Sequence, residues 1–306
     1  MKFQNQMFFK ELECSTNQKF LIKSVLGLGF VSSVCFPFLQ LLVILVEELE
    51  GVHPAIYALL PDKTRVTYDR MWRMIENLRP QQFNPDRVSC DFEEALFNSV
   101  TLAYPNANID GCFFHFVKNF YKHIVENQLK DLYVNDAQFA LTARMIPALA
   151  FVPPNDLDIV FAALQAVLPA NLTPILQWLE NNYLGRRVGR QGNRRQPTFP
   201  IEMWNVHERV VNHIGRTNNY AEAAHRRVQL ELKTTHPTVW KLITDLKTIQ
   251  KGRDAFYESL VAGNPPPKKL QRYIDCDNRI LRIVGNYQQY QVKTEFLRGI
   301  AHNFMM

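Results

Sequence analysis

Two acidic residues that lie far apart in the chain could act together on a phosphodiester. Asp91 follows a short apolar run, residues 87–90, that is typical of a strand. Glu222 lies in a segment of helical pattern that begins after the polar residues 216–219. Phosphodiester chemistry with two metal ions needs carboxylates from separate elements, because Mg²⁺ prefers oxygen ligands and the two ions sit about 4 Å apart. An acid after a strand is more often a helix cap, so Asp91 and Glu222 form a candidate site only if the fold brings them together.

A second group of candidate residues is basic and lies between residues 183 and 227. This stretch holds nine arginines and three glutamates, and its local charge of +6 equals the net charge of the whole chain. Glycines at positions 185, 189 and 192 separate the charges, which indicates a flexible loop able to meet phosphates. The alternative is an ordinary solvated surface loop. The arginines that we expect at a phosphate-binding surface are Arg186, Arg187, Arg190, Arg194, Arg195, Arg216, Arg226 and Arg227.

The composition indicates a folded protein with a substantial core. Of its 306 residues, 47% are hydrophobic, including 21 Phe, 11 Tyr and 4 Trp, which excludes a disordered or fibrous chain. The five cysteines are odd in number and contain no C-x-x-C pair, so a secreted disulfide framework is not expected. A reducing compartment, the cytosol or the nucleus, suits them better.

The elements around Asp91 are predicted to alternate between strands and helices. Three strands are predicted from apolar runs at residues 31–35, 39–46 and 52–60. Glu50-Gly51 is the expected turn before the third strand, and Thr64 is the expected N-cap of a helix. The buried face of that helix would carry Tyr68, Met71, Trp72, Ile75 and Leu78. A strand at residues 87–90 and a helix at 93–103 follow, and this order predicts an α/β fold.

From residue 111 onward the pattern turns helical. Helices are predicted at residues 113–132, 137–149, 156–168 and 172–182. Thr238 is expected to cap a further amphipathic helix, and the prolines within residues 264–267 indicate a linker before one or two short helices. The sequence contains no internal repeat and no low-complexity segment.

One stretch, residues 24–46, has no charged residue and is long enough to span a membrane as a helix. It is interrupted by Gly27, Gly29 and Pro37 and is rich in β-branched and aromatic residues. A pair of buried strands explains these features better. We therefore expect no membrane span, and a membrane anchor through residues 24–46 is the weaker alternative.

Five short blocks of residues follow one another along the chain. They are PFLQL at residues 37–41, VHPAIYALLPDKT at 52–64, DFEEA at 91–95, GCFFHF at 111–116, and RTNN at 216–219 followed by Glu222 and His225. These blocks resemble the MULE transposase domain of Mutator-like elements over about residues 37–246. Each block alone is modest, but their common order is specific.

The resemblance implies an RNase H-like fold: a mixed sheet with a large helical insertion between the second and third acids of a D-D-E catalytic set. The helices at the carboxyl end would be an extension of it. Asp91 would be the second acid and Glu222 the third, and both would hold Mg²⁺ or Mn²⁺. The first acid belongs on the first strand, and counting back from Phe38 places it at Leu28, which has no carboxylate.

Leu28 implies a catalytically impaired protein, because the first acid in such folds bridges both ions. One explanation is a degenerate or domesticated transposase that keeps its fold. The other is a truncated or misjoined gene model in which the first strand has been replaced; in either case we expect a fragment or relic. The alternative is an active DNA transposase, which cleaves a strand and transfers the 3′-hydroxyl and would need an acid from elsewhere, such as Glu11 or Glu13.

The resemblance also assigns Cys112 and His115 to the C-x-x-H signature of the family. A helix would place both on one face, near enough for a metal ion. Because zinc needs four ligands, a structural zinc would have to recruit His123 or His225; otherwise Cys112 packs in the core and His115 lines the site. A later block of the family is matched by Asn218, Asn219 and His225.

The expected function is that of a transposase-derived nuclear protein that binds DNA through its phosphate backbone. No compact base-reading module is visible in the sequence. Family members generally act as multimers, so a homo-oligomer is expected. The predicted segments are residues 1–24 outside the family, 25–110 as the first part of the core, 111–215 as the insertion with the basic loop, 216–260 as the core helix with Glu222 and the next helix, and 261–306 as a helical tail.

Overall fold

The computed structural model describes residues 7–9, 19–27, 40–78, 85–188, 193–214, 238–268 and 270–304. Two compact units share these residues. Unit 1 comprises Met1–Asp110 and Asn218–Pro267, and unit 2 comprises Gly111–Thr217 and Lys268–Met306. Each unit is therefore built from two separate stretches of chain.

Unit 1 is organised around a mixed sheet of six strands in the order β1-β4-β3-β2-β5-β6. The strands β2, β3 and β4 pair antiparallel in sequence order, and β5 joins β2 in parallel. Successive neighbours can pair antiparallel through short turns, whereas the parallel strand needs the crossover that the helix α1 supplies. The strands are β1 (Met7–Phe9), β2 (Lys19–Gly27), β3 (Gln40–Glu48), β4 (Gly51–Leu60), β5 (Arg87–Cys90) and β6 (Asn108–Gly111).

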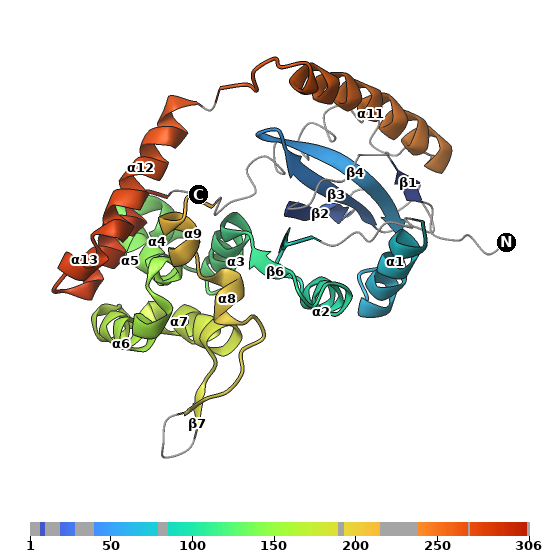
Figure 1. Cartoon of the computed structure of the whole chain (residues 1–306). Coiled ribbons are helices and arrows are strands. Elements are labelled where there is room, and N and C mark those ends of the chain that lie inside the picture. The colour runs from blue at the N-terminus through green and yellow to red at the C-terminus, as the bar shows by residue number, and fades with distance from the viewer. Residues whose placement is uncertain are drawn as a thin grey trace. The chain divides into compact units, whose positions relative to one another are not determined.

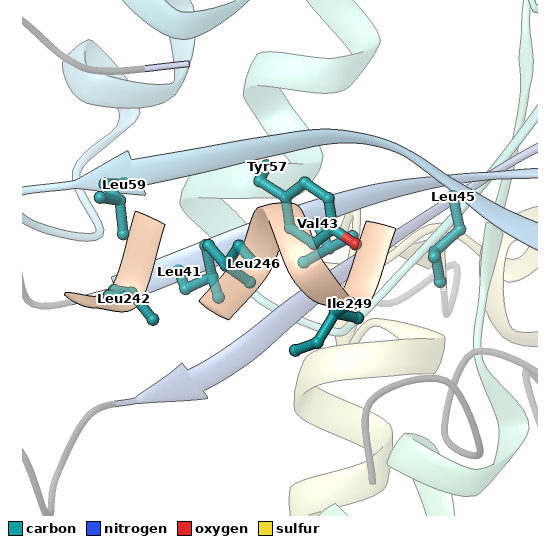
Figure 2. Packing of buried hydrophobic residues seen from close by; sticks show 8 residues of the cluster. All are labelled: Leu41, Val43, Leu45, Tyr57, Leu59, Leu242, Leu246 and Ile249. Carbon is teal, nitrogen blue, oxygen red and sulfur yellow. The ribbon is translucent and has the colours of Figure 1, made fainter. Parts of the chain in front are cut away.

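One face of this sheet is covered by the long helix α11 (Val239–Val261) (Figure 1). Side chains at alternate positions of β3 and β4 meet side chains of α11 about one helical turn apart. Figure 2 shows this cluster, whose eight residues are Leu41, Val43, Leu45, Tyr57, Leu59, Leu242, Leu246 and Ile249. Thr238 caps α11 as predicted, because its Oγ1 accepts a hydrogen bond from the Lys241 backbone N–H at 3.3 Å.

The helix α1 (Arg65–Leu78) packs on the alternate side chains of β3, since Tyr68 reaches Gln40 by a hydrogen bond. The predicted N-cap is confirmed: Thr64 Oγ1 accepts from the Thr67 backbone N–H at 3.3 Å. The next helix, α2 (Glu94–Ala103), is joined to α1 by a hydrogen bond from Ser99 Oγ to Asp69 Oδ1 at 2.5 Å. Both faces of β3 are thus buried, which explains the uninterrupted apolar run at its residues 41–46.

Unit 2 is helical and has an aromatic core. The Trp204 indole N–H donates to the Tyr183 carbonyl at 2.8 Å, and its ring stacks on Phe116 with centroids 5.6 Å apart. A short hairpin, β7 (Arg187–Val188) with β8 (Asn193–Arg194), extends away from the helices of this unit (Figure 1). The helices are α3 (Phe113–Glu126), α4 (Lys130–Asn135), α5 (Ala137–Ala148), α6 (Leu157–Val167), α7 (Thr173–Leu179), α8 (Ile201–Trp204), α9 (His207–Val211), α12 (Gln271–Gly285) and α13 (Lys293–Ala301).

The predicted α/β class is confirmed, and three differences from the predicted elements stand out. The strand expected at residues 31–35 lies outside the described residues, and the strand observed before β3 is β2. The strand β6 was not predicted, because Asn-Ile-Asp-Gly contains a single strong strand former. The helix expected at 113–132 is two helices, since Gln128 has a positive φ of 60° that ends the first.

The apolar stretch at residues 24–46 is extended where it is described. Ser24 pairs with Leu42 across β2 and β3, so the strand interpretation is confirmed for residues 24–27 and 40–46. Within the described parts of the chain, no helix is both long enough and apolar enough to cross a membrane.

Candidate functional site

Asp91 directly follows the carboxyl end of β5 and is half-buried. Its backbone carbonyl accepts a hydrogen bond from the Glu93 backbone N–H at 2.8 Å, which turns the chain from the strand into α2. The chain therefore leaves the strand in a fixed direction at Asp91. A carboxylate at the carboxyl end of a sheet strand is a common position for a functional group.

A buried tyrosine ties this turn to the rest of unit 1. The Tyr68 hydroxyl donates to Glu93 Oε1 at 2.5 Å and lies 3.1 Å from Gln40 Oε1. The Tyr68 side chain is fully buried, and so is Gln40. Burial, with the hydrogen bond and the charge of Glu93, raises the pKa of Tyr68 far above its usual range, so the hydroxyl keeps its proton as a donor.

Lys63 completes this group by donating to Glu93 Oε2 at 3.3 Å. The preceding Asp62 accepts from the Thr64 backbone N–H at 2.9 Å and from its hydroxyl at 2.8 Å. Burial raises the pKa of Asp62, but the hydrogen bonds from Thr67 and Thr64 outweigh this and lower it. We call Gln40, Lys63, Tyr68 and Glu93 the Tyr68 network; it joins three of the sequence blocks at residues 37–41, 52–64 and 91–95.

The Tyr68 network separates the roles of the two neighbouring acids. Glu93 is engaged through both carboxylate oxygens, by Tyr68 and by Lys63, and is therefore placed as an anchor of the turn. Asp91, two residues earlier at the end of β5, is the acid of this turn that the resemblance assigns to a metal ion. Sequence reasoning missed this group, although a tyrosine on the buried face of α1 needs a polar partner, which was the available signal.

Several predicted site residues lie outside the described residues, so the expected meeting of Asp91 and Glu222 stays a prediction. Leu28, at the expected first acidic position, is in the same situation. The others are Arg190, Arg216, Asn218, Asn219, His225, Arg226 and Arg227.

Cys112 and His115 lie at the start of α3, where Cys112 is the N-cap residue. Cys112 is fully buried and His115 is half-buried. His123, one of the histidines considered as a further ligand, has Nδ1 3.0 Å from Glu126 Oε2, and its ring contacts Trp178 in a tilted arrangement with centroids 4.3 Å apart. Among the residues that the structure describes, no group of three or more His, Cys, Asp or Glu is arranged to hold a metal ion.

The structure divides the arginines of the basic hairpin into two kinds. Arg194 is mostly buried and donates to Asp158 Oδ1 at 2.6 Å, to Glu180 Oε1 at 2.9 Å and to the Gly185 carbonyl at 2.5 Å. Its guanidinium also lies over the Phe161 ring, 5.6 Å from the centroid. Arg186, Arg187 and Arg195 are exposed. Arg194 is thus an internal anchor of the hairpin, and the other three carry the exposed positive charge.

The residue before the hairpin has a backbone conformation that suits glycine. Gly185 has a φ of +83°, and a Cβ atom there would lie 1.8 Å from the Arg195 carbonyl oxygen. The two arms of the hairpin then pair, with the Arg195 backbone N–H donating to the Arg186 carbonyl at 2.8 Å. The first glycine of the basic segment therefore permits close approach of two backbones.

Fold and site together define a mixed α/β protein with an acid at the end of a parallel strand. A family model described as the MULE transposase domain matches residues 32–119, which confirms the resemblance over that part of the chain. The match includes the Tyr68 network, Asp91, Cys112 and His115. Neither the comparison with curated proteins nor that with solved structures gave a match.

Proposed function

We propose that this chain is a transposase-derived DNA-binding protein with impaired strand cleavage. The observation that carries the transposase origin is the match at residues 32–119, whose blocks converge on the Tyr68 network beside Asp91. Impaired cleavage is proposed because the expected first acidic position is Leu28.

An RNase H-like fold is part of this proposal. Its support is the mixed sheet of unit 1, in which three antiparallel strands are extended by the parallel strand β5. Asp91 at the end of β5 takes the place of the second acid. The third acid would be Glu222, and the intervening helices of unit 2 would be the insertion.

Divalent metal use follows from the family but not from the described donors alone. Asp91 and Glu222 would hold Mg²⁺ or Mn²⁺, which, when bound to a complete set of acids, activates water and stabilises the leaving oxygen. Carboxylate oxygens suit these ions. With Leu28 at the first position the donor set is incomplete, so we assign no cleavage step to the wild-type chain.

The proposed DNA contact is the exposed face of the basic hairpin, with Arg186, Arg187 and Arg195 meeting backbone phosphates. Guanidinium groups bind phosphates in two-pronged geometry, which favours arginine for this role. A nuclear location and a homo-oligomeric state belong to the same proposal, because the substrate is DNA and the family acts as multimers.

The test uses the purified full chain and a fluorescently labelled DNA duplex. We expect binding that weakens steeply as salt is raised, and no nicking in Mg²⁺ or Mn²⁺. Absence of binding at low salt would overturn the DNA-binding part. Metal-dependent nicking that disappears in Asp91→Ala and in Glu222→Ala would overturn the proposal of impaired cleavage and support an active transposase.

A further inference from the structure

We infer that Asp158 acts as an internal competitor for DNA phosphate: it pairs with Arg187 in the free protein and gives up this arginine when DNA binds, while Arg194 stays in place. The inference rests on the proposed DNA binding and adds to it a regulation of affinity by one acid.

Asp158 is shared by two arginines of the hairpin. Asp158 lies on α6 and its Oδ1 contacts both Arg187 Nη2, at 3.2 Å, and Arg194 Nε, at 2.6 Å. Burial raises the pKa of Asp158, but the hydrogen bond and charge of Arg194, with those of Arg187, outweigh this and hold it below the usual range. Asp158 is therefore an anion at neutral pH, shared by two arginines.

The two arginines differ in how easily they can leave Asp158. The Arg187 side chain is 51% exposed and Asp158 is 50% exposed, whereas the Arg194 side chain is only 15% exposed. An ion pair between two exposed side chains contributes little to stability, because water solvates both partners well. Arg194 keeps Glu180 and the Gly185 carbonyl as partners even without Asp158. Exchange therefore concerns Arg187 and leaves the anchor intact.

The pairing of the hairpin explains why Asp158 meets these two arginines. Arg187 and Arg194 are direct cross-strand partners, so their side chains lie on the same face of the hairpin. Arg186 and Arg195 form the neighbouring cross-strand pair and are joined by a backbone hydrogen bond of 2.8 Å. Because side chains alternate along a strand, this pair belongs to the opposite face of the hairpin. Like charges directly opposite each other are unfavourable unless an anion lies near them. Asp158 is that anion on one face.

The other face has no equivalent acid among the described residues that pair with the hairpin. The exposed Arg186 and Arg195 side chains are in no ion pair with a described residue. A phosphate of the DNA backbone would supply the missing negative charge at this pair. A second phosphate then replaces Asp158 as the partner of Arg187. Arg187 has one anionic partner before and after this exchange.

The experiment compares binding of the full chain to one labelled DNA duplex over a range of salt concentrations. The variant Asp158→Asn should bind about threefold tighter, since Arg187 no longer has to leave an exposed ion pair. The matched control is Asp131→Asn on α4, which removes the same charge from an exposed acid remote in sequence from the hairpin. In the Arg187→Gln background, Asp158→Asn should give no gain.

A second set of variants tests the division of roles. Each phosphate contact contributes about 0.9 to the slope of log affinity against log salt, so the double variant Arg186→Gln, Arg195→Gln, which removes the one phosphate contact of this pair, should lower that slope by about 0.9. Arg194→Gln should weaken binding and also speed hydrogen exchange of the Arg195 amide, which a mere loss of charge would leave unchanged. Arg187→Gln should leave that amide protected.

The outcomes separate this inference from the proposed function. If the wild-type chain binds no DNA, the proposed function fails and the inference with it. If the chain binds DNA but Asp158→Asn and Asp131→Asn have equal effects, the competitor role is wrong while DNA binding stands. A gain from Asp158→Asn that persists in the Arg187→Gln background would equally overturn the exchange at Arg187.

Discussion

At the scale of single residues, the candidate site depends on polar groups whose partners come from distant sequence blocks. Tyr68 is the centre of such a group, since its hydroxyl meets Gln40 from β3 and Glu93 from the turn after β5. A buried hydroxyl without a partner is costly, so each of these residues requires the others. These hydrogen bonds therefore fix the position of the turn that carries Asp91.

We predict that Tyr68→Phe lowers the free energy of unfolding of unit 1 by about 1.5–3 kcal/mol, because it removes a buried hydrogen bond to a charged carboxylate. The measurement is native-state hydrogen exchange of the β5 and α1 amides. The matched control is Tyr257→Phe, whose half-buried hydroxyl donates to Glu48 Oε2 at 3.2 Å, and we expect a smaller loss there. Equal losses in the two variants would show that the Tyr68 network does not hold the turn.

At the scale of elements, α11 gives unit 1 one of its two helical faces although it lies nearly two hundred residues after β3. The contact is apolar in its centre and polar at its edges, where the Tyr57 hydroxyl donates to Gln250 Oε1 at 3.0 Å. These edge bonds fix the lengthwise position of α11, because apolar burial alone is not directional. The sheet face and α11 therefore each depend on the other for their position.

We predict that Leu246→Ala lowers the free energy of unfolding of unit 1 by about 2–5 kcal/mol, since it leaves a cavity in the cluster of Figure 2. Hydrogen exchange of the β3 and β4 amides measures the loss. The control is Val261→Ala at the exposed end of the same helix, for which we expect a change within about 0.5 kcal/mol. A small effect of Leu246→Ala would mean that α11 is not part of this core.

At the scale of the whole molecule, a D-D-E site needs three segments that the chain separates widely. The acid at the end of β5 is described, while the positions of Leu28 and Glu222 remain predictions from the resemblance. The register of β2 with β5 pairs Leu21 with Ser89, and continuing it would bring Lys23 level with Asp91. Lys23 on β2 is therefore a second position, besides the expected Leu28, at which the missing acid can be tested.

We predict that Leu28→Asp gains Mg²⁺-dependent nicking of a DNA duplex, because it would supply the acid that the resemblance expects at the first position. Nicking should disappear with a metal chelator and in the double variant Leu28→Asp, Asp91→Ala. The uncharged Leu28→Asn controls for the change in size. If Lys23→Asp nicks DNA and Leu28→Asp does not, the missing acid belongs at position 23. If neither variant nicks DNA, the strand that should carry the first acid is not native to this fold.

The sequence by itself determined the local elements near Asp91 and the family resemblance. The turn near Glu50, the caps at Thr64 and Thr238 and the strand before Asp91 follow from short-range patterns, because capping and alternation depend on neighbouring residues. The same local rules failed at β6, where pairing within the sheet creates a strand from polar residues.

The tertiary structure alone decided which polar side chains are engaged and which remain exposed. Eight arginines are predicted together for one phosphate-binding surface, yet Arg194 is held by Asp158 and Glu180 while Arg186 and Arg195 face solvent. Likewise Glu93 is engaged because Tyr68 and Lys63, which lie 25 and 30 residues before it in the chain, reach its two carboxylate oxygens. Partners that are distant along the chain set these differences, since hydrogen bonds and ion pairs depend on distance in space.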